Sequence, residues 1–397
     1  MTKKKILIFD DVEDRARKWA DRLKRLPFVR KNFDLHPMTM VEFEDTVGML
    51  NQRRRDARTN KKATNIVWDH PLDEAAILIV DYDLLELNKI TYITAEEVAY
   101  LARCYSHCGL IVVLNQFGKN EFDLTLKGHP ESFADLNLGS EQIYNPGLWE
   151  EPWKGFRPWV WPLLPRALET YEKRSIELRS ALDHPIPSFL GIEGIVGLLP
   201  RTTVEFLQSR SRKIEETTFK DFVEGSRHGL GPRDKPIDDE AIARIAAARI
   251  HKWLERLVLP GQDILVDTPH LVSRFPSLLQ GNLKSKTTWK NVVTFESPSK
   301  AILKTNVIDR FRFKKDAWVS RTCWIWGQLS GYEEIEEVKN PWKKTEKADV
   351  VFCEDLSAYA PREAAKEFVA DLSSPFVRRY VAQADGVVYQ PLVRFAM

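Results

Sequence analysis

The sequence predicts an α/β N-terminal part built on a doubly wound parallel sheet, followed by a helical middle and a C-terminal α+β region. Two apolar runs, 6–9 and 76–80, are each followed directly by aspartates. Such runs are typical of strands buried on both faces, as in a parallel sheet. Strand and helix patterns alternate over the first 150 residues, which favours parallel strands joined by helical crossovers.

The N-terminal elements follow from apolar spacing and from start and stop residues. Apolar residues recur at helical spacing from Ala16 to Leu26, and Pro27 ends that helix. Thr94 is a predicted N-cap with Glu97 three residues later. The predicted strands are 5–10, 33–38, 76–81, 109–115 and 142–145, and the predicted helices are 12–26, 41–55 and 94–106.

Beyond residue 145 the composition changes. Residues 145–165 contain five prolines and four tryptophans, which exclude a regular helix and predict an ordered, packed connector. The clearest later helix is 238–257. In the last third we expect strands at 289–295, 317–326, 350–353 and 387–395 and a helix at 361–372. The expected domain organisation is an α/β domain at 1–148, a connector rich in proline and tryptophan at 149–165, a helical region at 166–280 and a strand-rich α+β region at 281–397.

Composition indicates a soluble chain in a reducing compartment. Of the 397 residues, 43% are hydrophobic and 29% charged, with a formal net charge of +2. No apolar run approaches the ~18 residues of a membrane span, and the first residues do not resemble a signal peptide. The spacing of the four cysteines indicates buried thiols, not a zinc site or a disulfide framework, so we expect a cytoplasmic protein.

The aspartates after the two apolar runs predict an acidic pocket. Asp10 and Asp11 follow the first strand, and Asp81 and Asp83 follow the third. In open α/β sheets, ligands bind beyond the carboxyl ends of the strands. Carboxylates gathered there raise one another's pKa unless a cation neutralises them, and Mg²⁺ prefers such oxygen ligands. The plainer interpretation, ordinary strand-end and N-cap residues, stays open.

On these residues, the first 150 positions resemble the receiver domain of two-component response regulators, which has a flavodoxin-like fold. The resemblance implies that Asp10 and Asp11 bind Mg²⁺ and that Asp83 offers its backbone carbonyl to the ion. It implies that Asp81 accepts a phosphoryl group from a histidine kinase. Asn115 then contacts that group.

Two positions depart from the family pattern. Asn115 stands where the family has Ser or Thr, and Asn145 stands where it has a lysine that neutralises a phosphoryl oxygen. Lys119 is close enough in sequence to substitute for that lysine. The departures favour an atypical receiver, or pseudo-receiver, that serves mainly as an interaction platform for a protein partner. A phosphorylatable, Mg²⁺-dependent receiver remains the alternative.

A basic and aromatic stretch at 282–321 is a second candidate surface. It holds ten Lys or Arg and three acidic residues, with aromatic rings interleaved. Such a pattern suits phosphate neutralisation and base stacking in a nucleic-acid interface, but it also suits a charged sheet with its rings in the core. Trp318, Trp324 and Trp326 lie at even offsets, which predicts one shared strand face. The candidate nucleic-acid or partner residues are Lys284, Lys286, Lys290, Arg310, Arg312, Lys314, Lys315 and Trp318.

Positive signals for an enzyme are few. Arg244 and His251 are similar in spacing to the Arg–His pair of HEPN ribonucleases, but two turns of a solvated helix give the same spacing. Phosphate-binding loops, nucleophile elbows and dinucleotide fingerprints do not occur. The sequence therefore predicts a signalling or regulatory protein of bacterial type, with a receiver-like domain and a C-terminal partner-binding module. The alternatives are a structural or adaptor subunit of a larger assembly, which could be defence-related, and a nucleic-acid-binding protein.

Overall fold

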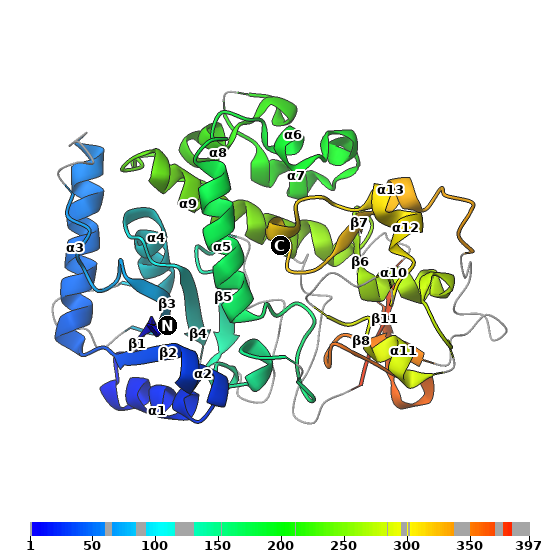
Figure 1. The fold of residues 1–397 in the computed structure, drawn as a ribbon. Coiled ribbons are helices and arrows are strands. Elements are labelled where there is room, and N and C mark those ends of the chain that lie inside the picture. The colour runs from blue at the N-terminus through cyan, green and yellow to red at the C-terminus, as the bar shows by residue number, and fades with distance from the viewer. Residues whose placement is uncertain are drawn as a thin grey trace.

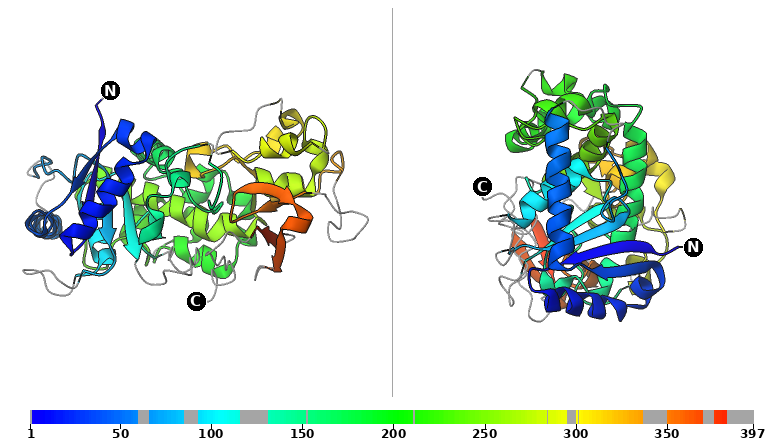
Figure 2. Two further views of the ribbon diagram at one scale, coloured as in Figure 1. Left: turned by 90° about the horizontal axis from the view of Figure 1, so that it is seen from below. Right: turned by 90° about the vertical axis from the view of Figure 1, so that its left-hand side faces the viewer.

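The computed structural model shows a mixed α/β protein with a five-stranded sheet at one end, a four-stranded sheet toward the other end and helices between them (Figure 1). The view from below agrees: the N-terminal sheet lies at one end and the C-terminal strands at the other (Figure 2). The structure describes residues 2–59, 66–84, 93–115, 131–151, 153–210, 212–283, 285–294, 300, 302–336, 350–369 and 376–382.

The N-terminal sheet has five strands, all parallel, in the order β2-β1-β3-β4-β5. This arrangement, with helices flanking it, is consistent with the predicted flavodoxin-like fold. The strand β1 lies inside the sheet, between β2 and β3, as its apolar run predicts. Its residues Ile6, Ile8 and Phe9 have no exposed surface and pack on both faces of the sheet. The strands are β1 (Lys4–Phe9), β2 (Phe33–Pro37), β3 (Ala75–Asp81), β4 (Leu110–Asn115) and β5 (Leu136–Gly139).

The helices beside this sheet begin at recognisable caps. Thr39 and Glu42 form a reciprocal capping box, and the Thr94 side chain accepts the backbone N–H of Glu97, as predicted. The Phe9 ring stacks on Phe43 with centroids 3.5 Å apart, which joins the sheet to α3. These helices are α1 (Glu13–Lys24), α2 (Pro27–Asn32), α3 (Met40–Arg58) and α4 (Ala95–Tyr105).

The fifth strand was predicted at the wrong place. It is Leu136–Gly139, whereas the predicted segment 142–145 follows a 3-10 turn, η3 (Ser140–Gln142). In β5 only Leu136 and Leu138 are buried, so the strand has a two-residue apolar alternation that is too short to stand out.

The connector is ordered where it is described, and it packs into the core. Trp149, Trp159 and Trp161 are each at most 1% exposed, as expected of large rings in a proline-rich segment. A continuous apolar core runs from the N-terminal sheet through the connector to α5 and α9. The helices of the middle are α5 (Leu164–Leu178), α6 (Ile186–Leu190), α7 (Arg201–Leu207), α8 (Phe219–Gly225) and α9 (Asp239–Trp253), with short turns η4 (Pro146–Leu148), η5 (Glu193–Leu198), η6 (Ile214–Glu216), η7 (Leu254–Val258) and η8 (Leu259–Gly261).

The C-terminal region is built from short elements. A two-stranded sheet pairs β6 with β7, and a four-stranded sheet has the order β10-β11-β8-β9. The strands are β6 (Leu265–Asp267), β7 (Cys323–Ile325), β8 (Val350–Cys353), β9 (Ala358–Pro361), β10 (Lys366–Val369) and β11 (Arg378–Val381). The helices are α10 (Thr268–Arg274), α11 (Lys286–Lys290), α12 (Thr305–Ile308) and α13 (Trp326–Leu329), with η9 (Pro276–Leu278), η10 (Asp309–Phe311), η11 (Asp316–Trp318) and η12 (Arg362–Ala364).

Several C-terminal predictions were wrong. The predicted strand at 289–295 begins inside α11. The described part of the predicted helix at 361–372, residues 361–369, forms η12 and β10 instead. Only 323–325 of the predicted strand 317–326 is extended, so the three tryptophans do not share a strand face. The strand at 350–353 is confirmed, and 387–395 lies outside the described residues. Short elements carry too few residues for a periodic signal.

All four cysteines are buried free thiols, as predicted. Within the described ranges, no helix combines the length and the apolar character needed to cross a bilayer.

Candidate functional site

The strand register brings the predicted aspartates together at one edge of the sheet. Phe9 of β1 pairs with Val80 of β3, and both strands run in the same direction. The residues that follow, Asp10 and Asp81, therefore meet where the two strands end. Together with Asp11 they form the acidic cluster, in which one carboxylate oxygen of each residue lies within 4.8 Å of those of the other two.

The acidic cluster is buried. Asp10 and Asp81 have no exposed surface, and Asp11 is 8% exposed. Burying several carboxylates together is unfavourable unless they are hydrogen-bonded, protonated or neutralised by a cation. Asp10 Oδ1 accepts the backbone N–H of Val12 at 2.8 Å, but its buried Oδ2 has no hydrogen-bond partner within the described structure.

The pKa of Asp10 is raised from 3.8 to about 7, first by burial of the carboxyl group and then by the nearby charge of Asp81. The hydrogen bond from Val12 and the charge of Arg15 oppose this rise in pKa. Near neutral pH the negative charge of the acidic cluster is therefore only partly compensated by Arg15, and a divalent cation would supply the remaining positive charge.

Arg15 was not predicted as a site residue, although it partly neutralises the acidic cluster. Its Nη1 lies 3.6 Å from Asp10 Oδ1 and 3.9 Å from Asp81 Oδ2, and its side chain is 41% exposed. It projects from the first turn of α1, directly after the acidic pair. The sequence did hold a sign of this role, because Arg15 lies five residues after Asp10, in the first turn of the helix that follows the strand.

The chemistry of these donors fits a magnesium ion. Carboxylate oxygens are the ligands that Mg²⁺ prefers, and it is commonly held by one or two carboxylates plus waters. The buried Asp10 Oδ2 is an oxygen available to such an ion. Because the Arg15 side chain is partly exposed, it can move toward solvent when a cation enters.

The other predicted members lie at the same edge but outside the acidic cluster. Asp83 is half-buried, two residues beyond β3, and its carboxylate is not among those that converge. Asn115 is the last residue of β4 and pairs with Gly139 of β5. It therefore stands at the carboxyl end of the strand next to Asp81.

Asn145 does not lie where the family resemblance placed it. It follows η3 and not the end of β5, and its side chain is engaged locally. Its Nδ2 donates to the Phe156 carbonyl at 2.9 Å, and its Oδ1 accepts from the Gly147 N–H at 2.9 Å. This side chain serves as a cap at the start of η4, because Pro146 fixes the first turn there. Lys119 lies outside the described residues.

The aromatic residues of the basic stretch are mostly buried. Trp289, Phe313 and Trp318 are at most 3% exposed, and Trp318 donates its indole N–H to Glu177 at 2.9 Å. A ring in the core cannot stack on a base. The prediction that Trp318 belongs to a nucleic-acid surface is therefore wrong, because its ring is buried.

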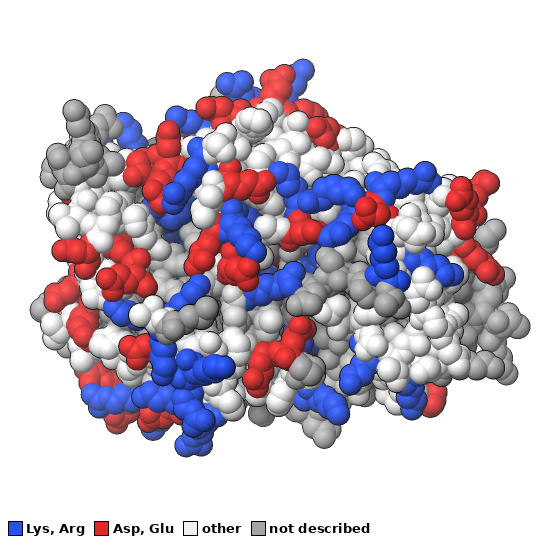
Figure 3. Space-filling view, in the orientation of Figure 1, with Lys and Arg blue, Asp and Glu red and all other residues white. Residues whose placement is uncertain are grey.

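Three basic side chains of this stretch, Arg312, Lys314 and Lys315, form ion pairs with acids. Lys315 Nζ lies 2.6 Å from Glu177, and Lys314 Nζ lies 3.5 Å from Asp309. Arg312 forms an ion pair with Asp316, and Arg310 lies over the ring of Tyr332. On the face shown in Figure 3, positive and negative side chains are intermingled. Lys286 and Lys290 are exposed on α11, and Lys284 lies outside the described residues.

The arginine and histidine with ribonuclease-like spacing do not lie on a solvated face. Arg244 is only 6% exposed, and the His251 ring contacts the Trp318 carbonyl with Nδ1 at 2.9 Å. The solvated-helix interpretation was wrong, because α9 runs through the middle of the molecule and is surrounded by packed elements.

Comparison with known proteins identified no similar protein. No protein-family model, no curated protein and no solved structure matches the chain.

Proposed function

We propose that the chain is a signalling or regulatory protein whose residues 1–148 form an atypical receiver-like domain of flavodoxin-like topology. The observation that supports this is the convergence of Asp10, Asp11 and Asp81 within 4.8 Å at the carboxyl edge of the parallel sheet. The sheet order β2-β1-β3-β4-β5 is the one expected of that fold. In this proposal, the helical middle and the C-terminal region bind a protein partner.

Within the acidic cluster, Asp81 is the proposed phosphoryl acceptor. One of its carboxylate oxygens attacks the phosphorus of a phosphohistidine on a kinase. The new P–O bond forms as the P–N bond breaks, and the imidazole leaves with the bonding electrons and takes a proton from solvent. Mg²⁺ held by Asp10, Asp11 and the backbone carbonyl of Asp83 would screen the negative charges that repel this attack.

Arg15 is the proposed source of the positive charge that Asn145 cannot supply. Its guanidinium already lies 3.9 Å from Asp81, whereas the Asn145 amide is bonded to Phe156 and carries no charge. An arginine suits this role because its planar donors match phosphate oxygens. Asn115, at the end of the adjacent strand, donates a hydrogen bond to the phosphoryl group.

A second candidate is a docking platform that works without phosphoryl transfer. It is favoured by the local engagement of Asn145 and by the pairing of Arg15 with the acidic cluster, since both give a stable structure without a phosphoryl group. The basic stretch supports nucleic-acid binding less well, because Trp289, Phe313 and Trp318 are buried and three of its basic side chains are paired with acids.

A beryllofluoride experiment separates the two candidates. The thermal unfolding midpoint is measured in buffer, with Mg²⁺, and with Mg²⁺ plus beryllofluoride, which mimics an aspartyl phosphate. The receiver proposal expects a further rise on adding beryllofluoride, lost in Asp81→Asn. Asp14→Asn, an exposed acid on α1, is the matched control and should respond like the wild type. Equal midpoints with and without beryllofluoride in the wild type would favour the docking platform.

A further inference from the structure

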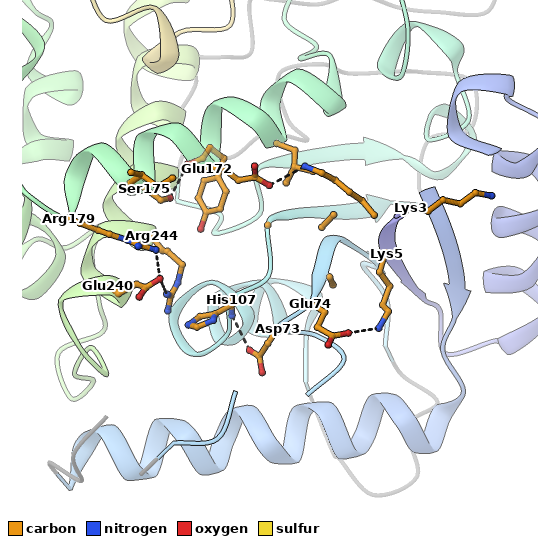
Figure 4. Close-up of a pocket in the computed structure, with 17 residues that line it drawn as sticks. Lys3, Lys5, Asp73, Glu74, His107, Glu172, Ser175, Arg179, Glu240 and Arg244 are labelled. Atoms are coloured by element: carbon orange, nitrogen blue, oxygen red, sulfur yellow. Dashed lines mark hydrogen bonds and ion pairs between the residues drawn. The ribbon is translucent and has the colours of Figure 1, made fainter. Parts of the chain in front are cut away.

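A cavity of about 550 Å³ opens at the edge of the sheet opposite the acidic cluster. It lies between the starts of β1, β3 and β4 and the helices α5 and α9, as Figure 4 shows. Because the five strands are parallel, their amino ends gather here while their carboxyl ends form the acidic cluster. The cavity therefore belongs to neither the proposed receiver site nor the basic stretch.

Arg244 of α9 lines this cavity as a buried cation with unused hydrogen-bonding capacity. Its side chain is 7% exposed, and within the described structure none of its three guanidinium nitrogens makes a hydrogen bond. Burial lowers the pKa of Arg244, which reflects incomplete compensation of its charge. A buried guanidinium without hydrogen bonds is costly, and an anionic ligand would remove that cost.

The nearest carboxylate to Arg244 is shared with a second arginine. Glu240 Oε1 lies 3.3 Å from Arg244 Nη1 and 2.6 Å from Arg179 Nη2. In Figure 4 the two arginines approach Glu240 from α9 and from the end of α5. One carboxylate oxygen thus stands between two guanidinium groups, an arrangement that suits a phosphate oxygen. Glu240 is 40% exposed, so its side chain can rotate into solvent.

The other acids of the cavity wall are already paired. Asp73 accepts two hydrogen bonds from Arg53, Glu74 pairs with Lys5, and Glu172 pairs with Lys4. Among the described acids of the cavity wall, Glu240 is the one within ion-pair distance of Arg244, and Arg179 also uses it. The Arg244 guanidinium also lies 5.7 Å from the centroid of the Trp68 ring, which makes no hydrogen bond to it.

The cavity also has an apolar wall. Leu168, Tyr171 and Ile176 of α5 line it together with Ala75 and Ala76 at the start of β3. A volume of about 550 Å³ exceeds that of a single phosphate group and lies in the range of small-molecule sites. The occupant therefore needs an anionic group for the arginines and an organic part for this wall.

We propose that this cavity binds a small phosphate monoester, whose phosphate replaces the Glu240 carboxylate between Arg179 and Arg244 while its organic part packs on the α5 side of the cavity. The inference is independent of the proposed receiver function, since the two sites lie at opposite edges of the sheet.

Binding is measured on the full chain by titration calorimetry with inorganic phosphate and with phenyl phosphate, in EDTA and at constant ionic strength set with chloride. Phenyl phosphate should bind more tightly than inorganic phosphate, because only it reaches the apolar wall. Arg244→Gln should weaken binding at least tenfold, and Glu240→Gln should strengthen it several-fold, because it removes the competing carboxylate. Arg201→Gln, at an exposed ion pair on α7, is the matched control and should bind as the wild type does.

If Arg244→Gln folds poorly, Arg179→Gln tests the same site. The Arg179 side chain is 55% exposed, so its replacement should leave the fold intact. It should weaken phosphate binding as well. Absence of binding by the wild type would overturn the proposal. Equal affinities of the wild type, Arg244→Gln and Arg179→Gln would also overturn it, and so would weaker binding by Glu240→Gln.

Discussion

Replacing Asp10 by Asn should stabilise the protein at alkaline pH when no divalent cation is present. Asp10 has no exposed surface and lies beside Asp81 in the acidic cluster. An amide has nearly the same shape, and its oxygen can still accept the Val12 N–H. The substitution therefore removes a buried charge while it retains the main hydrogen bond of that side chain.

The magnitude follows from the pKa of Asp10, which rises from 3.8 in the unfolded chain to about 7 in the folded protein. Because the folded state holds this proton more tightly, the free energy of unfolding falls as pH rises from about 4 to about 7, then levels off. At ~1.4 kcal/mol per pKa unit, the full loss is about 4 kcal/mol. The lost attraction to Arg15 offsets part of the gain, so we expect Asp10→Asn to be more stable by about 2–4 kcal/mol at pH 8.

The assay is urea unfolding of both proteins in EDTA, followed by tryptophan fluorescence at several pH values from 5 to 9. The stability difference should grow by about 2 kcal/mol between pH 5 and pH 8 and then stay constant. The exposed Asp14→Asn control should show no such trend. A lower stability of Asp10→Asn at pH 8, or a difference independent of pH, would refute the reasoning that Asp10 is a buried, uncompensated acid.

Three further predictions concern other buried groups. His270→Gln should cost about 3 kcal/mol at pH 6, because His270 bonds to Asp267 on one side and to a second buried carboxylate on the other. These partners raise the pKa of His270, so its contribution is complete below about pH 6.5 and the loss in urea-unfolding free energy should shrink as pH rises above that raised pKa. Asp234→Asn should cost about 2 kcal/mol at pH 7, because two arginines of α3 hold the pKa of Asp234 at about 2, and thermal unfolding should show the difference vanish as pH falls toward 2. Gly109→Ala should cost about 2 kcal/mol in urea unfolding, because a Cβ there would lie 2.3 Å from the Ala76 carbonyl oxygen; an unchanged midpoint would contradict this.

The N-terminal sheet and its acidic cluster could be predicted from sequence because their signals are local and strong. The strands β1 and β3 are continuous apolar runs, each followed by an aspartate, and parallel strands place their carboxyl ends at one edge of the sheet. The side chains of Asp10 and Asp81 could thus be brought together without knowing the rest of the fold.

Other features depend on tertiary contacts that no local pattern carries. The strand β5 has only two buried residues. Residues 366–369 pair with β11 as a strand, although their sequence pattern is helical. The cavity proposed to bind a phosphate monoester was missed because its two arginines, Arg179 and Arg244, come from different helices. Their convergence on Glu240 is visible only once α5 and α9 are packed together.

The proposed function requires that the acidic cluster binds a divalent cation. The most direct measurement is the anomalous difference map of crystals grown with Mn²⁺, which takes the same oxygen ligands as Mg²⁺. We predict one strong peak within coordination distance of the Asp10 and Asp81 carboxylates, with the Arg15 guanidinium displaced from Asp10. A map without a peak there, from crystals in which Arg15 keeps its contacts with both aspartates, would contradict this prediction.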